Sequence, residues 1–292
     1  MRLLLPMPGN EALGAAIAAA VPAECGALET RRFPDGERYV RIPGDVRGRD
    51  VDIVCTLADP DPQFLGLAFT AATARELGAR SVNLVSPYLA YMRQDIRFRL
   101  GESVSSRHFA RLLSGVFDRL ITIDPHLHRI ASLDEIFTIP TTVLQAEPLL
   151  GDWVRAHVGN PLLIGPDSES EQWVTVVGRH AGAPHIVLAK QRLGDREVVI
   201  TAADPAALRG HTLVLVDDMI SSGQTMITAA EQLVAQGFGK PVCLTVHALF
   251  AGDAYARLLA VSQAVVSTDT VPHVSNGVSV AGLLAAAITM PA

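Results

Sequence analysis

The sequence predicts an α/β fold built from parallel sheets with helices on both faces, and three observations lead to that prediction. Short runs rich in Val, Ile and Leu recur along the chain, each too apolar for a strand with one solvated face. Helical patterns lie between these runs, and strands that alternate with helices pair in parallel. The chain has 292 residues, which is long enough for two domains because single hydrophobic cores stop growing at roughly 250 to 300 residues.

The elements follow in order from the N-terminus. Arg2 to Met7 predicts a first strand, and the next helix is expected to be capped near Asn10 with Glu11 in its first turn. Further apolar runs predict buried strands over residues 51–57, 81–87, 119–125, 161–167, 184–190, 211–218 and 241–248. Helices are expected over residues 65–77, 106–113 and 225–236, the last with apolar residues at three- and four-residue spacing.

A domain boundary is expected near residue 146. The apolar run at 141–144 gives way there to Glu147 and Pro148, which open a new helical pattern. We therefore expect an N-terminal domain over residues 1–146 and a C-terminal domain over residues 147–292. Each would hold several strands and helices, although the two halves show no clear sequence repetition.

Composition and charge narrow the function. The net charge of -6 and the sequence pI near 5.8 argue against a nucleic-acid surface, but local arginine clusters leave a small anionic substrate open. Cys55 and Cys243 stand in apolar runs far from Cys25, so we expect reduced thiols, no metal-thiolate site and a cytoplasmic protein. No apolar run reaches the ~18 residues of a membrane span. Pro-Gly-Asn-Glu interrupts the apolar N-terminus, which argues against a secretory leader.

Polar residues stand at the predicted carboxyl ends of the strands, where open α/β sheets bind their ligands. They are Asp124, His126, Asp167, Lys190, Asp217 and Asp218. Among the 24 basic residues only Lys190 and Lys240 are lysines. A lysine that persists against such a bias indicates chemistry that arginine cannot perform.

The stretch LVLVDDMISSGQT, residues 213–225, joins two kinds of site. A strand followed by Ser-Ser-Gly-Gln-Thr and a helical pattern places backbone amides and hydroxyls at a helix N-terminus, which binds anions. The preceding Asp217 and Asp218 suit hydroxyl groups or Mg²⁺ instead. A ligand with both a phosphate and vicinal hydroxyls, such as a phosphorylated ribose, would satisfy both parts. The alternative is a plain turn with two solvated acids before a capped helix.

VDDMISSGQT resembles the phosphoribosyl-binding motif shared by phosphoribosyltransferases and phosphoribosyl pyrophosphate synthetases. Other stretches resemble the synthetases specifically and occur in that family's order: FPDGE at 33–37, PYLAYMRQD at 87–95, IDPHLH at 123–128, IGPD at 164–167 and KQR at 190–192. The similarity extends from about residue 31 to TDTVPH at 268–273. It implies two phosphoribosyltransferase-like domains, the first on the ATP side and the second binding ribose 5-phosphate and carrying the catalytic loop.

The resemblance also implies an activity and a set of residues. The family transfers the β,γ-diphosphoryl group of Mg-ATP to the anomeric hydroxyl of ribose 5-phosphate, giving 5-phospho-α-D-ribose 1-diphosphate and AMP. The implied catalytic residues are Lys190 and Arg192; the implied ATP-binding residues are Phe33, Asp35, Glu37, Arg93, Gln94, Asp95 and His126; and the implied Mg²⁺ ligands are His126 and Asp167. The implied ribose-5-phosphate residues are Asp217 and Asp218 on the sugar hydroxyls and Ser221, Ser222, Gly223, Gln224 and Thr225 on the phosphate. A homo-oligomer with an active site shared across an interface is implied as well.

Several of these residues have plainer interpretations from the sequence alone. Phe33 is as consistent with packing as with base stacking, and the segment at 93–95 lies among arginines typical of a solvated loop. His128 is two residues from His126, and chemistry does not separate them, although spacing favours His126. Arg107 and His108 are expected on the surface of a helix.

The chain departs from the family pattern in three places. Pro166 and Asp167 are followed by Ser-Glu-Ser-Glu, which adds Glu169 and Glu171 beside a supposed diphosphate. Gln224 follows Gly223 where a small residue and then glycine are common. The lysine-rich continuation after Arg-Gln-Asp is replaced by residues 96–99, Ile-Arg-Phe-Arg. These departures suggest a divergent branch.

Two alternatives stay open at this point. A phosphoribosyltransferase would consume the activated sugar rather than make it, but such enzymes are usually a single domain and would have no use for FPDGE and Arg-Gln-Asp. A non-catalytic homologue that binds a true synthetase would tend to interrupt the catalytic loop, whereas KQRLGDRE keeps its charged positions.

Overall fold

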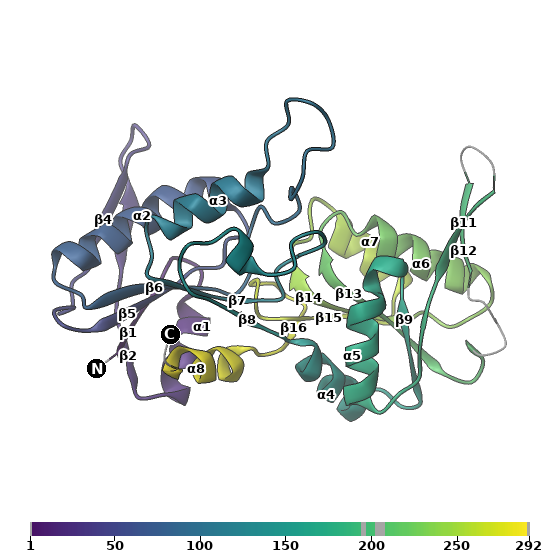
Figure 1. Cartoon of the computed structure of the whole chain (residues 1–292). Coiled ribbons are helices and arrows are strands. Elements are labelled where there is room, and N and C mark those ends of the chain that lie inside the picture. Colours follow the sequence, from purple (N-terminus) through teal and green to yellow (C-terminus); the bar gives the residue numbers. More distant parts are fainter. Residues whose placement is uncertain (1, 194–196, 202–207, 291–292) are drawn as a thin grey trace. The chain divides into compact units, whose positions relative to one another are not determined.

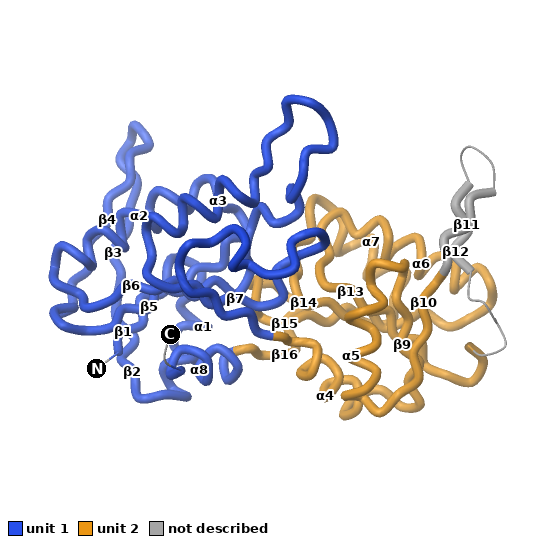
Figure 2. Tube along the Cα trace, in the orientation of Figure 1, with its two compact units in different colours: residues 1–144, 281–292 blue, residues 145–280 orange. Residues whose placement is uncertain are grey.

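The structure is a computed structural model that describes residues 2–193, 197–201 and 208–290 (Figure 1). Its contacts divide the chain into two compact units, residues 1–144 with 281–292 and residues 145–280 (Figure 2). The C-terminal residues 281–292 belong to the first unit. The boundaries expected from the sequence, 1–146 and 147–292, place them in the second domain. Each unit is an α/β sandwich around its own parallel sheet, which confirms the predicted fold class.

The first unit has a sheet in the order β2-β1-β5-β6-β7-β8, and all neighbouring strands are parallel. The strands are β1 (Arg2–Pro6), β2 (Ala23–Cys25), β5 (Asp50–Val54), β6 (Ser81–Ser86), β7 (Arg119–Ile123) and β8 (Thr141–Leu144). The helices are α1 (Glu11–Ala20), α2 (Pro60–Glu76), α3 (Ser105–Ser114), α8 (Ala281–Thr289) and the 3₁₀ turn η1 (Leu133–Glu135). Helices α2 and α3 cover one face of the sheet, and α1 and α8 pack together on the other (Figure 1).

The second unit repeats this arrangement with the order β10-β9-β13-β14-β15-β16, again all parallel. The strands are β9 (Pro161–Gly165), β10 (His185–Val187), β13 (Thr212–Ile220), β14 (Val242–Ala248), β15 (Ala264–Thr268) and β16 (Asn276–Val278). The helices are α4 (Glu147–His157), α5 (Glu171–Ala181), α6 (Gln224–Ala235), α7 (Ala254–Val261) and the 3₁₀ turn η2 (Ser168–Ser170).

Each unit also carries an antiparallel hairpin directly after the second strand of its sheet. The hairpins are β3 (Glu29–Arg32) with β4 (Arg38–Arg41), and β11 (Ala189–Leu193) with β12 (Glu197–Thr201). Strand order and hairpin position thus coincide in the two units, which indicates a structural duplication that the sequence does not display. In both sheets the strand order reverses beside the first strand, and such a switch point is where open α/β sheets bind ligands.

Two local expectations need correction. Asn10 precedes α1, but its side chain makes no helix-capping bond. Its Oδ1 instead accepts a hydrogen bond from the backbone N–H of Thr56 at 2.8 Å, which joins the loops after β1 and β5. Strand β13 extends to Ile220 rather than ending at residue 218, because Met219 and Ile220 stay in register with His247 and Ala248.

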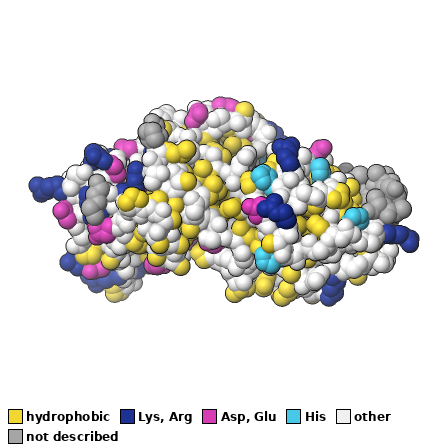
Figure 3. All heavy atoms as spheres, turned by 90° about the horizontal axis from the view of Figure 1, so that it is seen from below, with side chains coloured by type: hydrophobic (Ala, Val, Ile, Leu, Met, Phe, Trp, Pro, Cys, Tyr) yellow, Lys and Arg dark blue, Asp and Glu magenta, His cyan; other side chains and the backbone are white. Residues whose placement is uncertain are grey.

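Two of the cysteines lie in the core, and charged side chains lie on the surface (Figure 3). Cys55 and Cys243 are buried and form no disulfide, and burial raises the pKa of each thiol to about 12, so both are protonated at neutral pH. Acidic and basic side chains are scattered among uncharged ones on the face in Figure 3. No helix in the described part of the chain is long and apolar enough to span a membrane.

Candidate active site

Three carboxylates gather at the switch point of the second sheet. Asp167 follows β9, and Asp217 and Asp218 lie near the carboxyl end of the adjacent strand β13. The side chain of Asp218 is only 3% exposed. Its Oδ1 accepts a 2.8 Å hydrogen bond from the N–H of Met219, while Asp217 Oδ1 accepts one of 3.1 Å from the N–H of Asp218. The two acids are therefore held by the strand itself.

The electrostatics of this group favour a cationic or hydroxyl-bearing partner. Burial raises the pKa of Asp217 well above its ordinary value, and the neighbouring charges of Asp218 and Asp167 raise it further. Hydrogen-bond donors or a cation beside such a carboxylate stabilise its charged form. No group of three or more His, Cys, Asp or Glu side chains within the described residues is arranged to hold a metal ion.

The loop after β13 forms the N-terminus of α6. Gly223 has φ of 68°, a left-handed conformation that glycine adopts without steric cost. A Cβ there would also meet Ile220, Ile227 and Ala254 at 3.4 to 3.5 Å. The first N–H groups of a helix have no partner within it, so the residues around Thr225 present amides to an anion. The structure thus places the acid pair and the N-terminus of a helix in succession, and anion binding at this loop stays a prediction.

The unusual residue of this loop, Gln224, has its side chain occupied. Its Oε1 accepts a hydrogen bond from Nη2 of Arg257 at 3.2 Å, and its Nε2 donates to Oγ1 of Thr228 at 2.9 Å. Both partners belong to helices, α7 and α6. The longer side chain is accordingly held along the helices.

The segment after β9 is a capped 3₁₀ turn. Asp167 Oδ1 accepts from the N–H of Glu169 at 3.1 Å, and Ser170 Oγ accepts from the N–H of Asp167 at 3.3 Å. Gly165 makes this turn possible, because a Cβ there would come within 2.5 Å of Ser170 Oγ. Glu169 and Glu171 are exposed and line a shallow hollow. Water can therefore screen the two acids that depart from the family pattern.

Lys190 and Arg192 belong to the backbone of the hairpin β11–β12. Lys190 pairs with Ile200 and Arg192 with Val198. Their side chains, like residues 194–196 and 202–207, lie outside what the structure describes. Their catalytic roles stay predictions.

The FPDGE segment forms the turn of the hairpin β3–β4 in the first unit. Phe33 N–H donates to Glu37 O at 2.8 Å, and Asp35 Oδ1 accepts from the N–H of Glu37 at 3.2 Å. The Phe33 ring is 37% exposed and has the guanidinium of Arg31 at 4.7 Å from its centroid. Glu37 lines a hollow of about 600 Å³ between the hairpin and α2. Phe33 is thus a surface ring in contact with a cation, not a core side chain.

The Arg-Gln-Asp segment is tied to the loop that carries His126. Asp95 is 5% exposed and accepts from the backbone N–H of Arg129 at 3.1 Å and from its Nη1 at 3.0 Å. Arg93 is exposed, and Gln94 Nε2 donates to the carbonyl of Ile96 at 3.4 Å. Asp95 therefore holds the loop at Arg129 in place, and Arg93 is the exposed residue of this segment.

The two histidines that the sequence does not separate lie against each other. The rings of His126 and His128 are perpendicular, with centroids 4.1 Å apart, and their Nε2 atoms form a hydrogen bond. His126 is half-buried and His128 is exposed. Asp124 precedes them with φ of 37°, which turns the chain sharply at the end of β7.

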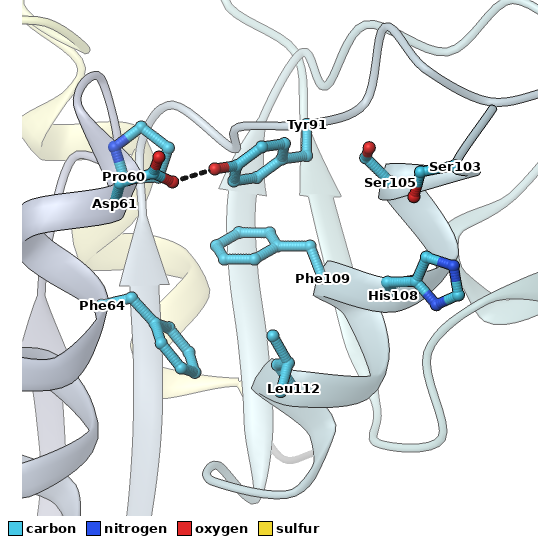
Figure 4. A pocket seen from close by; sticks show the side chains of 9 residues that line it. All are labelled: Pro60, Asp61, Phe64, Tyr91, Ser103, Ser105, His108, Phe109 and Leu112. Carbon is cyan, nitrogen blue, oxygen red and sulfur yellow. Dashed lines mark hydrogen bonds between the residues drawn. The ribbon is translucent and has the colours of Figure 1, made fainter.

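A cavity of about 340 Å³ in the first unit was not predicted (Figure 4). Tyr91 forms one wall in a left-handed conformation with φ of 65°, and its hydroxyl donates to the carboxylate of Asp61. That bond is the main reason why the pKa of Tyr91 is raised. The other lining residues are Pro60, Phe64, Ser103, Ser105, His108, Phe109 and Leu112. They come from α2, α3 and the loops before them, so no single sequence segment signals the cavity.

Two α/β units of the same strand order, the second with an acid pair before a helix N-terminus at its switch point, indicate a class of protein, that of the phosphoribosyltransferase-type domains. Family comparisons agree with this class. Residues 3–116 match the N-terminal domain of ribose phosphate pyrophosphokinase, and residues 132–284 match the phosphoribosyl transferase domain. The chain belongs to the ribose-phosphate pyrophosphokinase family.

Individual relatives support this assignment. The ribose-phosphate pyrophosphokinase of Methanopyrus kandleri is 39% identical over 280 residues, which is 94% of each chain. That of Methanosarcina acetivorans is 34% identical over 283 residues, 96% of this chain and 97% of the relative. The crystal structure of phosphoribosylpyrophosphate synthetase from Mycobacterium smegmatis superposes with a TM-score of 0.84 over 99% of this chain and 98% of that one. At 24% identity that likeness shows the shared fold.

Proposed function

We infer that the chain is a ribose-phosphate diphosphokinase, which converts ribose 5-phosphate and Mg-ATP into 5-phospho-α-D-ribose 1-diphosphate and AMP. The observation that carries this inference is similarity to ribose-phosphate pyrophosphokinases over nearly the whole chain, including the ATP-side domain that a phosphoribosyltransferase has no need of. The alternatives of a transferase or a regulatory homologue gain no such support.

Ribose 5-phosphate fits the second unit in two parts. The carboxylates of Asp217 and Asp218 accept hydrogen bonds from the ribose hydroxyls, which shares the charge that otherwise raises the pKa of Asp217. The amides and hydroxyls of Ser221, Ser222, Gly223, Gln224 and Thr225 take the 5-phosphate at the start of α6. Strand β13 fixes the spacing between these parts.

ATP binding falls to residues of the first unit. Phe33 offers an exposed ring for the base, with Asp35 and Glu37 in the same turn. Arg93 is an exposed arginine, while Gln94 and Asp95 shape its segment. In a homo-oligomer the hairpin turn would serve the site of a neighbouring subunit. Mixing inactive Phe33→Ala and Lys190→Ala proteins tests this arrangement, because a shared site regains activity in mixed oligomers and an unshared site does not.

Mg²⁺ fits the chemistry of the donor groups, since carboxylate oxygens are the ligands it prefers and Asp167 lies beside the charge of Asp217. We assign Asp167 to its binding, and a metal role for His126, which belongs to the other unit, stays a prediction. When bound, the ion neutralises the charge of the ATP phosphates.

The reaction needs little covalent help from the protein. The anomeric oxygen forms a bond to the β-phosphorus of ATP, the bond from that phosphorus to the oxygen bridging to the α-phosphate breaks, and AMP leaves with the bridging oxygen. The proton of the anomeric hydroxyl passes to solvent. Lys190 and Arg192 supply positive charge to the transferring group, as a compact ammonium and a planar fork. Formation of AMP from ATP only when ribose 5-phosphate is present tests the proposal, and a transferase or a regulatory homologue gives none.

A further inference from the structure

Phe250 has a backbone conformation that is unusual for its residue type. It follows β14 with φ of 29°, in the left-handed region where a Cβ crowds the backbone. Such a residue persists only where its surroundings enforce the conformation, and these residues concentrate at functional sites. The contacts of Phe250 should therefore explain how the protein enforces this conformation and what the conformation does.

The consequence lies in the backbone bonds that this turn makes. The N–H groups of Leu249 and Phe250 both donate to the carbonyl of Ile220, at 3.0 and 2.9 Å. The N–H of Ala251 donates to the carbonyl of Ser221 at 2.9 Å. Three successive amides thus fix the carbonyls at the start of the phosphate loop.

The cause lies in the ring of Phe250. Its centroid is 4.7 Å from that of His273 and 5.2 Å from that of Tyr255, and the latter two rings are 4.7 Å apart at 80°. These separations are those of favourable aromatic pairs. The three rings come from the turn after β14, from α7 and from the loop before β16, so together they hold the turn against the rest of the unit.

His273 is itself fixed within this cluster. Its Nδ1 accepts a hydrogen bond from the N–H of Ser275 at 3.2 Å, and the Ser275 hydroxyl lies 2.7 Å from the same nitrogen. Its backbone N–H donates to Oδ1 of Asn276 at 2.8 Å. The imidazole therefore gives Phe250 a rigid surface to pack on.

We propose that Phe250, Tyr255 and His273 form an aromatic clamp, which enforces the left-handed turn at Phe250 and so positions the loop at 221–225 for the phosphate of ribose 5-phosphate. These are positioning residues, since they act through the backbone of the loop. The proposal rests on the proposed function. It predicts that damage to the clamp weakens binding of the sugar phosphate and leaves ATP binding alone.

Phe250→Ala and Phe250→Gly together test the clamp. Alanine loses the ring but keeps the crowded Cβ, whereas glycine loses the ring and tolerates a positive φ. We expect Phe250→Ala to raise KM for ribose 5-phosphate about tenfold, with KM for ATP unchanged. We expect Phe250→Gly to raise it less. Ordinary packing predicts the reverse order, because glycine removes more of the side chain, and that order would overturn the proposal.

Two further variants complete the test. Phe238→Ala is the matched control, because Phe238 is also half-buried against the core of this unit, and it should leave both KM values unchanged. Should Phe250→Ala not fold, Tyr255→Leu removes one ring of the clamp and keeps its bulk. It should raise KM for ribose 5-phosphate selectively. An equal rise in both KM values, or none, contradicts the clamp.

Calorimetric binding of ribose 5-phosphate distinguishes failure of the clamp from failure of the proposed function. If the unmodified protein binds the sugar phosphate and forms AMP while Phe250→Ala binds equally tightly, the clamp is wrong and the function stands. If the unmodified protein neither binds ribose 5-phosphate nor forms AMP, the proposed function is wrong and the clamp falls with it.

Discussion

Replacing Asp217 with Asn should stabilise the ligand-free protein and abolish its function. The carboxylate is held beside Asp218 and Asp167, and burial with their charges raises its pKa well above the ordinary value. Asparagine keeps an oxygen for the 3.1 Å hydrogen bond from the N–H of Asp218 and removes the charge. Because the substitution removes an unfavourable charge, we expect the free energy of unfolding at pH 8 to rise by on the order of 1 to 3 kcal/mol, the usual size of a single-residue effect.

The effect must depend on pH with a defined sign. Since the pKa of Asp217 is higher in the folded chain, the unfolded chain releases its proton first as pH rises. The unmodified protein therefore loses stability above the ordinary aspartate pKa of about 3.9, until the folded carboxyl has also ionised. The stability advantage of Asp217→Asn should be small near pH 4 and larger at pH 8. Thermal unfolding monitored by circular dichroism at both pH values measures it.

Ribose 5-phosphate should reverse the order of stability of the unmodified protein and Asp217→Asn. At a thousand times its Kd, ribose 5-phosphate adds about 4.1 kcal/mol to the free energy of unfolding of the protein that binds it, so the unmodified chain should then be more stable than Asp217→Asn. Asp50→Asn is the control of opposite sign, because a hydrogen bond from Arg80 lowers the pKa of Asp50 to about 2. That variant should be less stable at neutral pH. Asp217→Asn being less stable than the unmodified protein at pH 8, or equally favoured at both pH values, would refute the reasoning.

Three further predictions follow from the same structure. Lys190→Ala should lower kcat by about 10²- to 10³-fold with little change in KM, as for a lost transition-state donor, and an unchanged kcat removes the residue from the mechanism. Arg119→Met should cost about 1.5 to 3 kcal/mol in urea unfolding, because the buried guanidinium donates to the carbonyl of Met290 at the end of α8 at 2.8 Å. A stability equal to that of the unmodified chain would show that this bond does not anchor the helix. Arg129→Ala should destabilise more than Asp95→Asn, since it leaves a buried carboxylate without its guanidinium, and the reverse order of urea midpoints would contradict the assigned burial.

Much of the fold could be predicted because parallel strands that are buried on both faces have continuous apolar runs in the sequence. The runs at 51–57, 81–87 and 161–167 correspond to β5, β6 and β9. The positions of the acid pair and of the helix N-terminus that follows it could be predicted equally well, since a strand, two carboxylates and a Ser-Ser-Gly turn are adjacent in the chain. Local sequence is sufficient where the site is local.

The rest depends on contacts between distant segments. Strand β3 is polar and mostly exposed, and β4 is a half-buried strand of only four residues, so no apolar alternation indicates this hairpin. Asn10 is of a residue type that caps helices. Its side chain instead accepts a hydrogen bond from the backbone N–H of Thr56, in the loop after the neighbouring strand. The clamp joins Phe250 to His273 across 23 positions of sequence, and neither residue shows its partner in the sequence. Only packing reveals such pairs.

The most direct test of the account is ³¹P NMR of the reaction of the purified protein with Mg-ATP and ribose 5-phosphate. We predict signals of AMP and of a diphosphate ester at the anomeric carbon, appearing together in equal amounts. ADP in place of AMP, or consumption of ATP that does not depend on the sugar phosphate, would contradict transfer of the β,γ-diphosphoryl group.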